Sequence, residues 1–191
     1  ILKEAYLSLL EEYKVLIKFN NNQVSDEKRV FIYINQYLEG NHSPSIITRK
    51  YSNEFSKLGY KVIIVSCTPN PFPYSLSLNV KATQSNLQIG EVVSLEENIF
   101  IIEMGGTPNE QNIYKDFVDG LNISNRDILL TIGHSCIHFD LLPFNNKFLI
   151  PTSMDAYFSS ARHYILPSKT TWKNLYNEEM KYVQGPSSYN D

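Results

Sequence analysis

Hydrophobic and polar positions along the chain follow two different periods. Apolar residues recur at helical spacing over residues 2–18, which predicts an amphipathic helix. Short runs rich in β-branched and aromatic residues at 29–35 and 60–66 predict two buried strands. Further buried strands of the same composition are expected at 127–132, 147–150 and 162–166, the last of which is expected to be the final strand.

A helix is expected between the first two strands. Pro44 or Ser45 can begin it, because proline and serine suit the first turn of a helix, and Gly59 can end it. A strand, a crossover helix and a second strand within this length form a βαβ unit, in which the two strands are parallel. The side chains expected to point inward from this helix are Ile46, Ile47, Tyr51, Phe55 and Leu58.

The segment 79–103 differs from the rest of the chain, because three short runs of strand composition lie close together there. We expect a β-hairpin or meander inserted at the edge of the sheet. Short helices are expected over 113–121 and 167–176. The pattern therefore predicts an α/β fold, with a Rossmann-like, mostly parallel sheet flanked by helices and a small antiparallel β insertion around 79–103.

The chain is expected to form one α/β domain with an appendage at each end. Residues 1–22 hold the N-terminal amphipathic helix and a loop, and residues 23–184 form the Rossmann-like domain. Residues 185–191 have the composition of a linker. We expect this linker to lead to a further domain of a longer protein.

Composition and charge narrow the classes of partner. The 191 residues are 42% apolar and 19% charged, which excludes a disordered or fibrous protein. The formal net charge of −3 does not favour nucleic acid as a partner. No apolar run is long enough to span a bilayer, and 2 cysteines are too few for a disulfide scaffold. We therefore expect a cytoplasmic protein without a transmembrane segment.

Ligands of parallel sheets bind at the carboxyl ends of the strands, so polar residues in the loops after these strands are candidates. His42, Ser43 and Ser45 follow the first strand, where they can hold hydroxyl groups of a sugar or a peptide. A turn with a helix cap explains them equally well. Thr152 and Ser153 begin a hydroxyl-rich segment that suits carbohydrate, but its composition is also that of an ordinary solvated loop.

A serine nucleophile is a further alternative. Gly133, His134 and Ser135 lie between a predicted strand and a helix, which is the setting of a hydrolase nucleophile elbow. Ile137 is bulky where such an elbow needs a small residue. A polar turn in which Ser135 caps the next helix is therefore favoured over a serine hydrolase.

Neither a metal nor a nucleotide cofactor is expected. His134, Cys136, His138 and Asp140 alternate, and they would share a face on a strand, but on a helix only the two histidines pair. Structural zinc sites usually draw their ligands from two separated pairs, so Cys136 is expected to be a small buried hydrophobe. The sequence has neither of the glycine-rich phosphate-binding loops, G-x-G-x-x-G and G-x-x-x-x-G-K-[ST].

The order of elements resembles the N-terminal half of a GT-B glycosyltransferase over residues 29–180. It is similar above all to bacterial enzymes that glycosylate proteins or surface glycans. The resemblance lies in pattern and placement, and the stretches that carry it are 41–45 (NHSPS), 58–65 (LGYKVIIV), 127–135 (DILLTIGHS), 148–153 (FLIPTS) and 163–168 (HYILPS).

This resemblance implies an enzyme that transfers a sugar from a nucleotide sugar to an acceptor hydroxyl or amide without an essential metal. The present chain would bind mainly a protein or glycan acceptor, and a missing C-terminal domain would bind the nucleotide sugar. His42 is then the expected catalytic base, because histidine titrates near neutral pH. The substrate-binding residues expected around the cleft are Asn41, Ser43, Ser45, Gly133, His134, Ser135, Thr152 and Ser153.

A non-catalytic α/β binding or assembly module is the alternative from a different class. The 79–103 segment is compatible with an acceptor platform and with a dimer edge, because an unpaired strand invites partners. A homo-oligomer is therefore left open.

Overall fold

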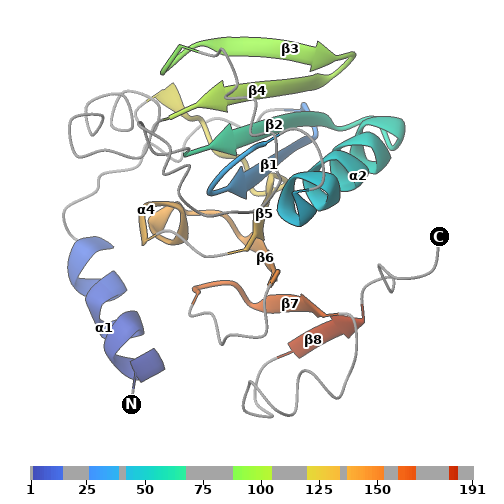
Figure 1. The fold of residues 1–191 in the computed structure, drawn as a ribbon. Coiled ribbons are helices and arrows are strands. Elements are labelled where there is room, and N and C mark those ends of the chain that lie inside the picture. The colour runs from blue at the N-terminus through green and yellow to red at the C-terminus, as the bar shows by residue number, and fades with distance from the viewer. Residues whose placement is uncertain are drawn as a thin grey trace.

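The computed structural model describes residues 2–14, 26–38, 42–67, 88–104, 120–133, 137–152, 159–166 and 181–184. These residues form an eight-stranded sheet with helices on both faces (Figure 1). The helices are α1 (Leu2–Lys14), α2 (Ser43–Lys57) and α4 (Ile137–Leu141). The strands are β1 (Arg29–Ile34), β2 (Lys61–Ser66), β3 (Val92–Glu96), β4 (Ile99–Glu103), β5 (Ile128–Ile132), β6 (Asn146–Ile150), β7 (His163–Leu166) and β8 (Lys181–Gln184).

The strand order is β3-β4-β2-β1-β5-β6-β7-β8. All neighbouring pairs are parallel except β3 and β4, which are antiparallel. Without the edge strand β3 this is the Rossmann order, in which the chain moves from a central strand to one side, crosses back and continues on the other side. The predicted Rossmann-like α/β fold is confirmed. The strand order reverses between β1 and β5, which makes this the topological switch point.

The central strands are buried because helices cover both faces of the sheet. Val30, Ile32 and Ile34 of β1 belong to the core beneath α2. Phe31 and Tyr33 alternate with them and belong to the core that includes Phe139 of α4 and the residues after it. The Tyr33 ring stacks on the Phe139 ring with centroids 4.4 Å apart. Helices α2 and α4 therefore lie on opposite faces, and β1 is buried between them.

Helix α2 ends at the glycine that the sequence indicates. Gly59 has a φ of +80°, a left-handed conformation that glycine adopts without steric cost. The N–H groups of Gly59 and Tyr60 donate to the carbonyls of Ser56 (2.9 Å) and Phe55 (3.0 Å), which is the Schellman pattern. The Tyr60 ring packs edge-on against Phe55 with centroids 5.5 Å apart, so a hydrophobic contact accompanies the helix end.

The innermost face of α2 carries small hydroxyl side chains. Ser45, Thr48 and Ser52 are 0%, 0% and 1% exposed. Leu58 is 68% exposed, so the prediction that it points inward is wrong. The reason is that Leu58 is the C-cap residue, where the backbone leaves the helix and the helical spacing no longer applies. The other expected inward residues of α2 are partly buried: Ile46, Ile47, Tyr51 and Phe55.

Helix α1 packs against α4. The Tyr6 hydroxyl donates a hydrogen bond of 2.5 Å to Oδ2 of Asp140. Asp140 is buried, and its carboxylate also accepts hydrogen bonds from the Ser159 hydroxyl (2.8 Å) and the Ser160 backbone N–H (3.0 Å). Asp140 therefore ties α1, α4 and the segment before β7 together. The remainder of the helix predicted over 2–18 lies outside the described residues.

An ion pair joins the segments at the amino ends of β1 and β5. Nη2 and Nε of Arg29 lie 2.6 Å from Oδ2 and 3.2 Å from Oδ1 of Asp127, a two-point contact. Asp127 is fully buried, and its Oδ2 also accepts the Ser124 backbone N–H at 2.7 Å. Arg29 Nη2 donates in addition to the Asn122 carbonyl. These contacts hold the two central strands at the end opposite to their carboxyl ends.

The antiparallel pair predicted within 79–103 is confirmed as β3 and β4, but only one of these two strands is an insertion. β4 also pairs in parallel with β2, from Val62 opposite Ile99 to Ser66 opposite Glu103. β4 is therefore a strand of the main sheet, and only β3 is added at its edge. The run at 79–83 lies outside the described residues.

Strand β8 corrects the expectation that β7 is the last strand. It pairs in parallel with β7, but only Tyr182 and Val183 of its residues have strand composition, and the polar Lys181 and Gln184 flank them. The helix predicted at 167–176, most of the helix at 113–121 and the linker at 185–191 lie outside the described residues.

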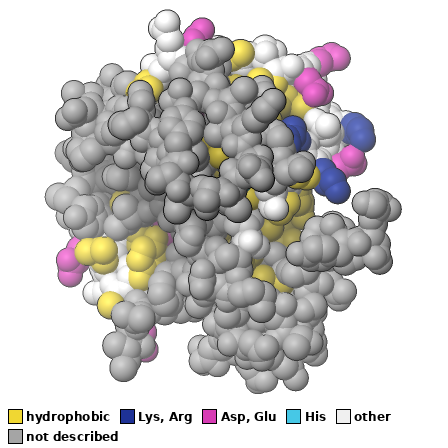
Figure 2. Space-filling model, viewed as in Figure 1, with side chains coloured by type: hydrophobic (Ala, Val, Ile, Leu, Met, Phe, Trp, Pro, Cys, Tyr) yellow, Lys and Arg dark blue, Asp and Glu magenta, His cyan; other side chains and the backbone are white. Residues whose placement is uncertain are grey.

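Two features of the described residues bear on membranes and charged partners. None of the described helices combines the length and the apolar character needed to cross a bilayer. On the face shown in Figure 2, basic and acidic side chains lie next to each other over α2. Lys57 and Glu54 form such a pair, with Nζ and Oε1 2.7 Å apart, and both side chains are exposed. This mixture agrees with the small net charge of the sequence.

Candidate functional site

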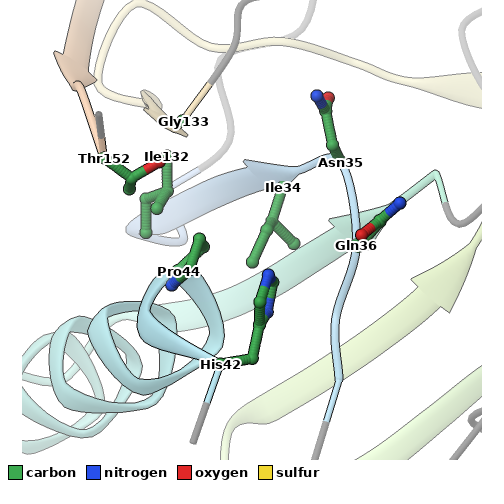
Figure 3. Close-up of a pocket in the computed structure, with 8 residues that line it drawn as sticks. All are labelled: Ile34, Asn35, Gln36, His42, Pro44, Ile132, Gly133 and Thr152. Carbon is green, nitrogen blue, oxygen red and sulfur yellow. The ribbon is translucent and has the colours of Figure 1, made fainter. Parts of the chain in front are cut away.

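A pocket of about 220 Å³ opens at the carboxyl ends of β1 and β5, at the topological switch point (Figure 3). In open parallel sheets, ligands bind in the crevice between the loops that diverge at this point. The position of the pocket in the fold therefore makes it the candidate ligand site. Its lining residues are Ile34, Asn35, Gln36, His42, Pro44, Ile132, Gly133 and Thr152.

Serine side chains fix the chain that leaves β1. Ser45 Oγ accepts the Leu38 backbone N–H at 2.8 Å and donates to the Gln36 carbonyl at 3.4 Å. Ser66, at the end of β2, accepts the Tyr37 backbone N–H at 3.3 Å. Residues 36–38 are thereby attached both to the helix and to the neighbouring strand. This support gives the pocket a fixed rim on the β1 side.

His42 precedes α2 at the N-cap position, but its side chain does not cap the helix. Its carbonyl accepts the Ile46 N–H at 3.0 Å, whereas its ring turns toward the pocket. Ring Nδ1 lies 2.7 Å from Ser45 Oγ. In Figure 3 the tip of the ring points toward Ile34, and Thr152 lies across the pocket. The ring is therefore held at its inner nitrogen and presents its outer edge to the pocket.

The environment of His42 favours the neutral imidazole. Burial lowers the pKa of His42 below the usual 6.5, and the positive charge of Arg49 lowers that pKa further. Arg49 Nη1 donates to the Leu38 carbonyl at 3.4 Å. This contact holds the guanidinium near the residues that follow β1. A neutral imidazole keeps a lone pair on one ring nitrogen. At pH 7 His42 can therefore accept a proton from a bound group.

Gly133 and Thr152 form the wall opposite His42. Gly133 has a φ of +87°, and its N–H donates to the Ile150 carbonyl at 2.9 Å, so the turn after β5 is tied to β6. A Cβ atom at position 133 would lie 3.2 Å from Thr152 Oγ1. Both the backbone conformation and the close approach therefore favour glycine. The approach places the Thr152 hydroxyl at the pocket.

Asn35 lines the pocket, and a hydrogen bond fixes the orientation of its side-chain amide. The Tyr33 hydroxyl donates to Asn35 Oδ1 at 2.5 Å, which leaves Nδ2 as the end of the amide that can donate to a ligand. The side chains of Asn35 and Gln36 both point away from His42 in Figure 3. Asn35 was not among the predicted site residues, although it is the last residue of the first predicted strand. Its position at the strand end was the available signal.

Some of the residues expected in the site meet at this pocket. His42, Gly133 and Thr152 line it, although they come from three separate loops. Ser45 is buried beneath His42 and does not line the pocket, and Ser43 is exposed at the first turn of α2. Four further candidates lie outside the described residues: Asn41, His134, Ser135 and Ser153.

The alternative chemistries gain no support from the described residues. Asp140, the acidic member of the alternating set, accepts hydrogen bonds from Tyr6 and Ser159, which occupy both of its carboxylate oxygens. Ser135, on which a serine hydrolase depends, is outside the described part of the chain, as is Cys136. Asp140 therefore has a structural role in joining α1 to the sheet.

A second hollow, of about 440 Å³, lies at the amino ends of the strands. It is larger than the switch-point pocket and has Lys28, Tyr60 and Arg126 in its lining. Parallel sheets bind their ligands at the opposite end, where loops rather than strand starts converge. We therefore assign the candidate site to the smaller pocket.

No protein-family model, no curated protein and no solved structure matches the chain.

Proposed function

We propose that this chain is the acceptor-binding half of a glycosyltransferase with the GT-B arrangement. The observation that carries the proposal is the position of the His42 ring at a pocket between the carboxyl ends of β1 and β5. Burial and Arg49 lower the pKa of this ring, which suits it to act as a base. The acceptor group binds in this pocket, and His42 acts as its base. A second domain, which the GT-B resemblance implies, holds the nucleotide sugar across the cleft.

The proposed reaction moves one proton and one glycosyl group. The acceptor hydroxyl or amide gives its proton to a ring nitrogen of His42 while its oxygen or nitrogen bonds to the anomeric carbon of the donor sugar. The bond from that carbon to the phosphate oxygen breaks, and the nucleotide leaves with the electron pair. General base catalysis of this kind contributes about 10²–10⁴-fold to a rate.

The polarity of the pocket supports an uncharged acceptor group. Thr152 brings a hydroxyl and Asn35 an amide, whereas none of the described lining residues is lysine or arginine. The sequence also has no glycine-rich phosphate loop. A pocket of this composition suits hydroxyl or amide groups better than a pyrophosphate. The nucleotide therefore belongs to the partner domain in this proposal.

The proposal is tested by sugar transfer in the protein that contains both domains. With labelled nucleotide sugars and a panel of glycan and peptide acceptors, His42→Ala is expected to lower kcat about 10²–10⁴-fold. The matched control is His163→Ala, because His163 begins β7 and stacks on Phe148 with ring centroids 5.2 Å apart, away from the pocket. This control is expected to keep the activity.

The pH profile is part of the same test. Because the pKa of His42 lies below 6.5, the base is already unprotonated at neutral pH. Wild-type kcat/KM is expected to fall as the pH drops through that lowered pKa, at pH values below 6.5. Full activity of His42→Ala would instead favour a binding or assembly module, and transfer by this chain alone would contradict the division of roles between two domains.

A further inference from the structure

We infer that Ser45 is a positioning residue that makes Nδ1 of His42 the N–H nitrogen and leaves Nε2 as the acceptor at the switch-point pocket. The catalytic meaning of this arrangement rests on the proposed function. The arrangement itself is a property of this chain, which can be measured without a substrate.

Ser45 lies at the centre of a small buried network. Its side chain is 0% exposed, and three polar groups surround its Oγ. The Leu38 backbone N–H donates to it at 2.8 Å, and the Gln36 carbonyl lies 3.4 Å away. His42 Nδ1 lies 2.7 Å away, the shortest of the three distances. Buried polar groups of this kind are nearly always paired, so all three contacts need a consistent proton arrangement.

The proton count of the serine hydroxyl selects one arrangement. A hydroxyl has one hydrogen to donate and can accept two hydrogen bonds. The Leu38 backbone N–H can only donate a hydrogen bond to Ser45 Oγ. The Gln36 carbonyl can only accept the hydrogen of the Ser45 hydroxyl. The third contact is satisfied together with these two only if His42 Nδ1–H donates to Ser45. The neutral ring then carries its lone pair on Nε2.

In the alternative arrangement, the Ser45 hydroxyl donates to His42 Nδ1, and the Gln36 carbonyl loses its partner in this network. If the Ser45 hydroxyl donated to Nδ1, it could no longer donate to the Gln36 carbonyl. The neutral ring would then carry its proton on Nε2, and it could not accept a proton from an acceptor group. The surroundings of Ser45 therefore decide whether His42 acts as a base or as a donor.

The support of Ser45 is rigid enough to keep this arrangement. Ser45 is in the first turn of α2, and its partners Gln36 and Leu38 flank Tyr37, whose N–H donates to Ser66 at 3.3 Å. Protonation of His42 at Nε2 leaves the Nδ1–H to Ser45 bond in place. His42 can therefore gain and lose a proton at Nε2 while its contact with Ser45 is kept.

Ser52 provides a matched control on the same helix. It is also a buried serine of α2, at 1% exposure, but its Oγ has no hydrogen-bond partner among the described residues. Ser45→Ala and Ser52→Ala thus remove the same atom from the same face of α2. Only the first removes a contact with His42.

Nitrogen-15 NMR of the free chain, labelled at histidine, tests the inference directly. Above the pKa of His42, the wild type is expected to show a protonated Nδ1 and an unprotonated Nε2. Ser45→Ala is expected to shift this population toward the Nε2–H tautomer, whereas Ser52→Ala leaves it unchanged. A wild-type spectrum with a protonated Nε2, or an unchanged spectrum in Ser45→Ala, would overturn the inference. The wild-type spectrum decides the matter even if Ser45→Ala does not fold.

Transfer kinetics then separate this inference from the proposed function. In the two-domain protein, Ser45→Ala is expected to lower kcat by about tenfold to 10⁴-fold with little change in the acceptor KM, since a base held in the wrong tautomer loses up to about 10⁴-fold. Ser45→Thr keeps the hydroxyl and is expected to recover part of the activity. The expected tautomer without any transfer would contradict the proposed function alone, whereas transfer with a protonated Nε2 would contradict this inference alone.

Discussion

Gly133 shows how a single residue shapes the wall of the candidate site. Its φ of +87° favours glycine, and a Cβ atom there would make a tight contact of 3.2 Å with the Thr152 hydroxyl. Gly59 has a similar φ of +80°, but no atom lies within 4 Å of the place of a Cβ atom. The two glycines therefore separate the cost of the backbone conformation from the cost of the contact.

Alanine substitutions at these glycines are expected to differ in stability. Gly59→Ala should lower the free energy of unfolding by about 1–2 kcal/mol, the cost of a left-handed alanine. Gly133→Ala should cost more, because Thr152 must also move. Urea unfolding measures both values, and Thr152→Ala combined with Gly133→Ala should restore the extra loss. Equal losses in the two single variants would show that the contact with Thr152 is unimportant.

At the scale of the element, a buried carboxylate helps to hold α1 in place. The Tyr6 hydroxyl reaches Asp140 across 134 positions of the sequence, and Leu10 of the same helix is buried. Hydrogen bonds to charged groups contribute about 1.5–3 kcal/mol. The attachment of α1 should therefore respond to the loss of a single hydroxyl group.

Tyr6→Phe is expected to loosen α1 selectively. The substitution keeps the ring and removes the hydrogen bond to Asp140, so the amide protons of α1 should exchange faster while those of β1 and β5 keep their protection. Hydrogen exchange read by NMR or mass spectrometry measures this difference. Uniform acceleration through the sheet would show instead that α1 is part of the cooperative core.

The sequence predicts best those strands whose apolar composition matches their burial in the sheet. β1, β2 and β5 are short β-branched runs buried on both faces, so composition alone indicates them. β8 has only two residues of strand composition, Tyr182 and Val183. β4 becomes a strand of the main sheet through its distant partner β2, which no local pattern reveals. Local periodicity therefore identifies strands but does not assign their neighbours.

The sequence predicted part of the candidate site, as it predicted part of the fold. The rule that ligands meet strand ends brings His42, Gly133 and Thr152 to one pocket, because it depends only on strand direction. The buried position of Ser45 was not predictable, since it depends on how closely α2 approaches the residues after β1. The orientation of Asn35 depends in the same way on the Tyr33 hydroxyl.

At the scale of the whole molecule, Arg29 and Asp127 connect the two halves of the Rossmann sheet. β1 begins one half and β5 begins the other, and the ion pair lies at their amino ends. Removal of one partner leaves an uncompensated buried charge, which costs about 3–5 kcal/mol. This is a large share of the total stability of about 5–15 kcal/mol typical of a domain.

Arg29→Met is therefore expected to lower the free energy of unfolding by about 3–5 kcal/mol. Arg126→Met is the matched control, because Arg126 is an exposed arginine next to Asp127, and its loss should change the stability by about 0.5 kcal/mol or less. Chemical denaturation measures both variants. A small effect of Arg29→Met would show that the carboxylate of Asp127 finds other compensation.

The separation between the Arg29–Asp127 ion pair and the switch-point pocket has an evolutionary consequence. The contacts that join the halves of the sheet lie at one end of β1, and the groups that would meet a ligand lie at the other. In the proposed function, substitutions at Asn35 or Thr152 can thus alter recognition without weakening that ion pair. Descendants of this scaffold can acquire new specificities while they inherit the same framework, and laboratory selection can use the same freedom.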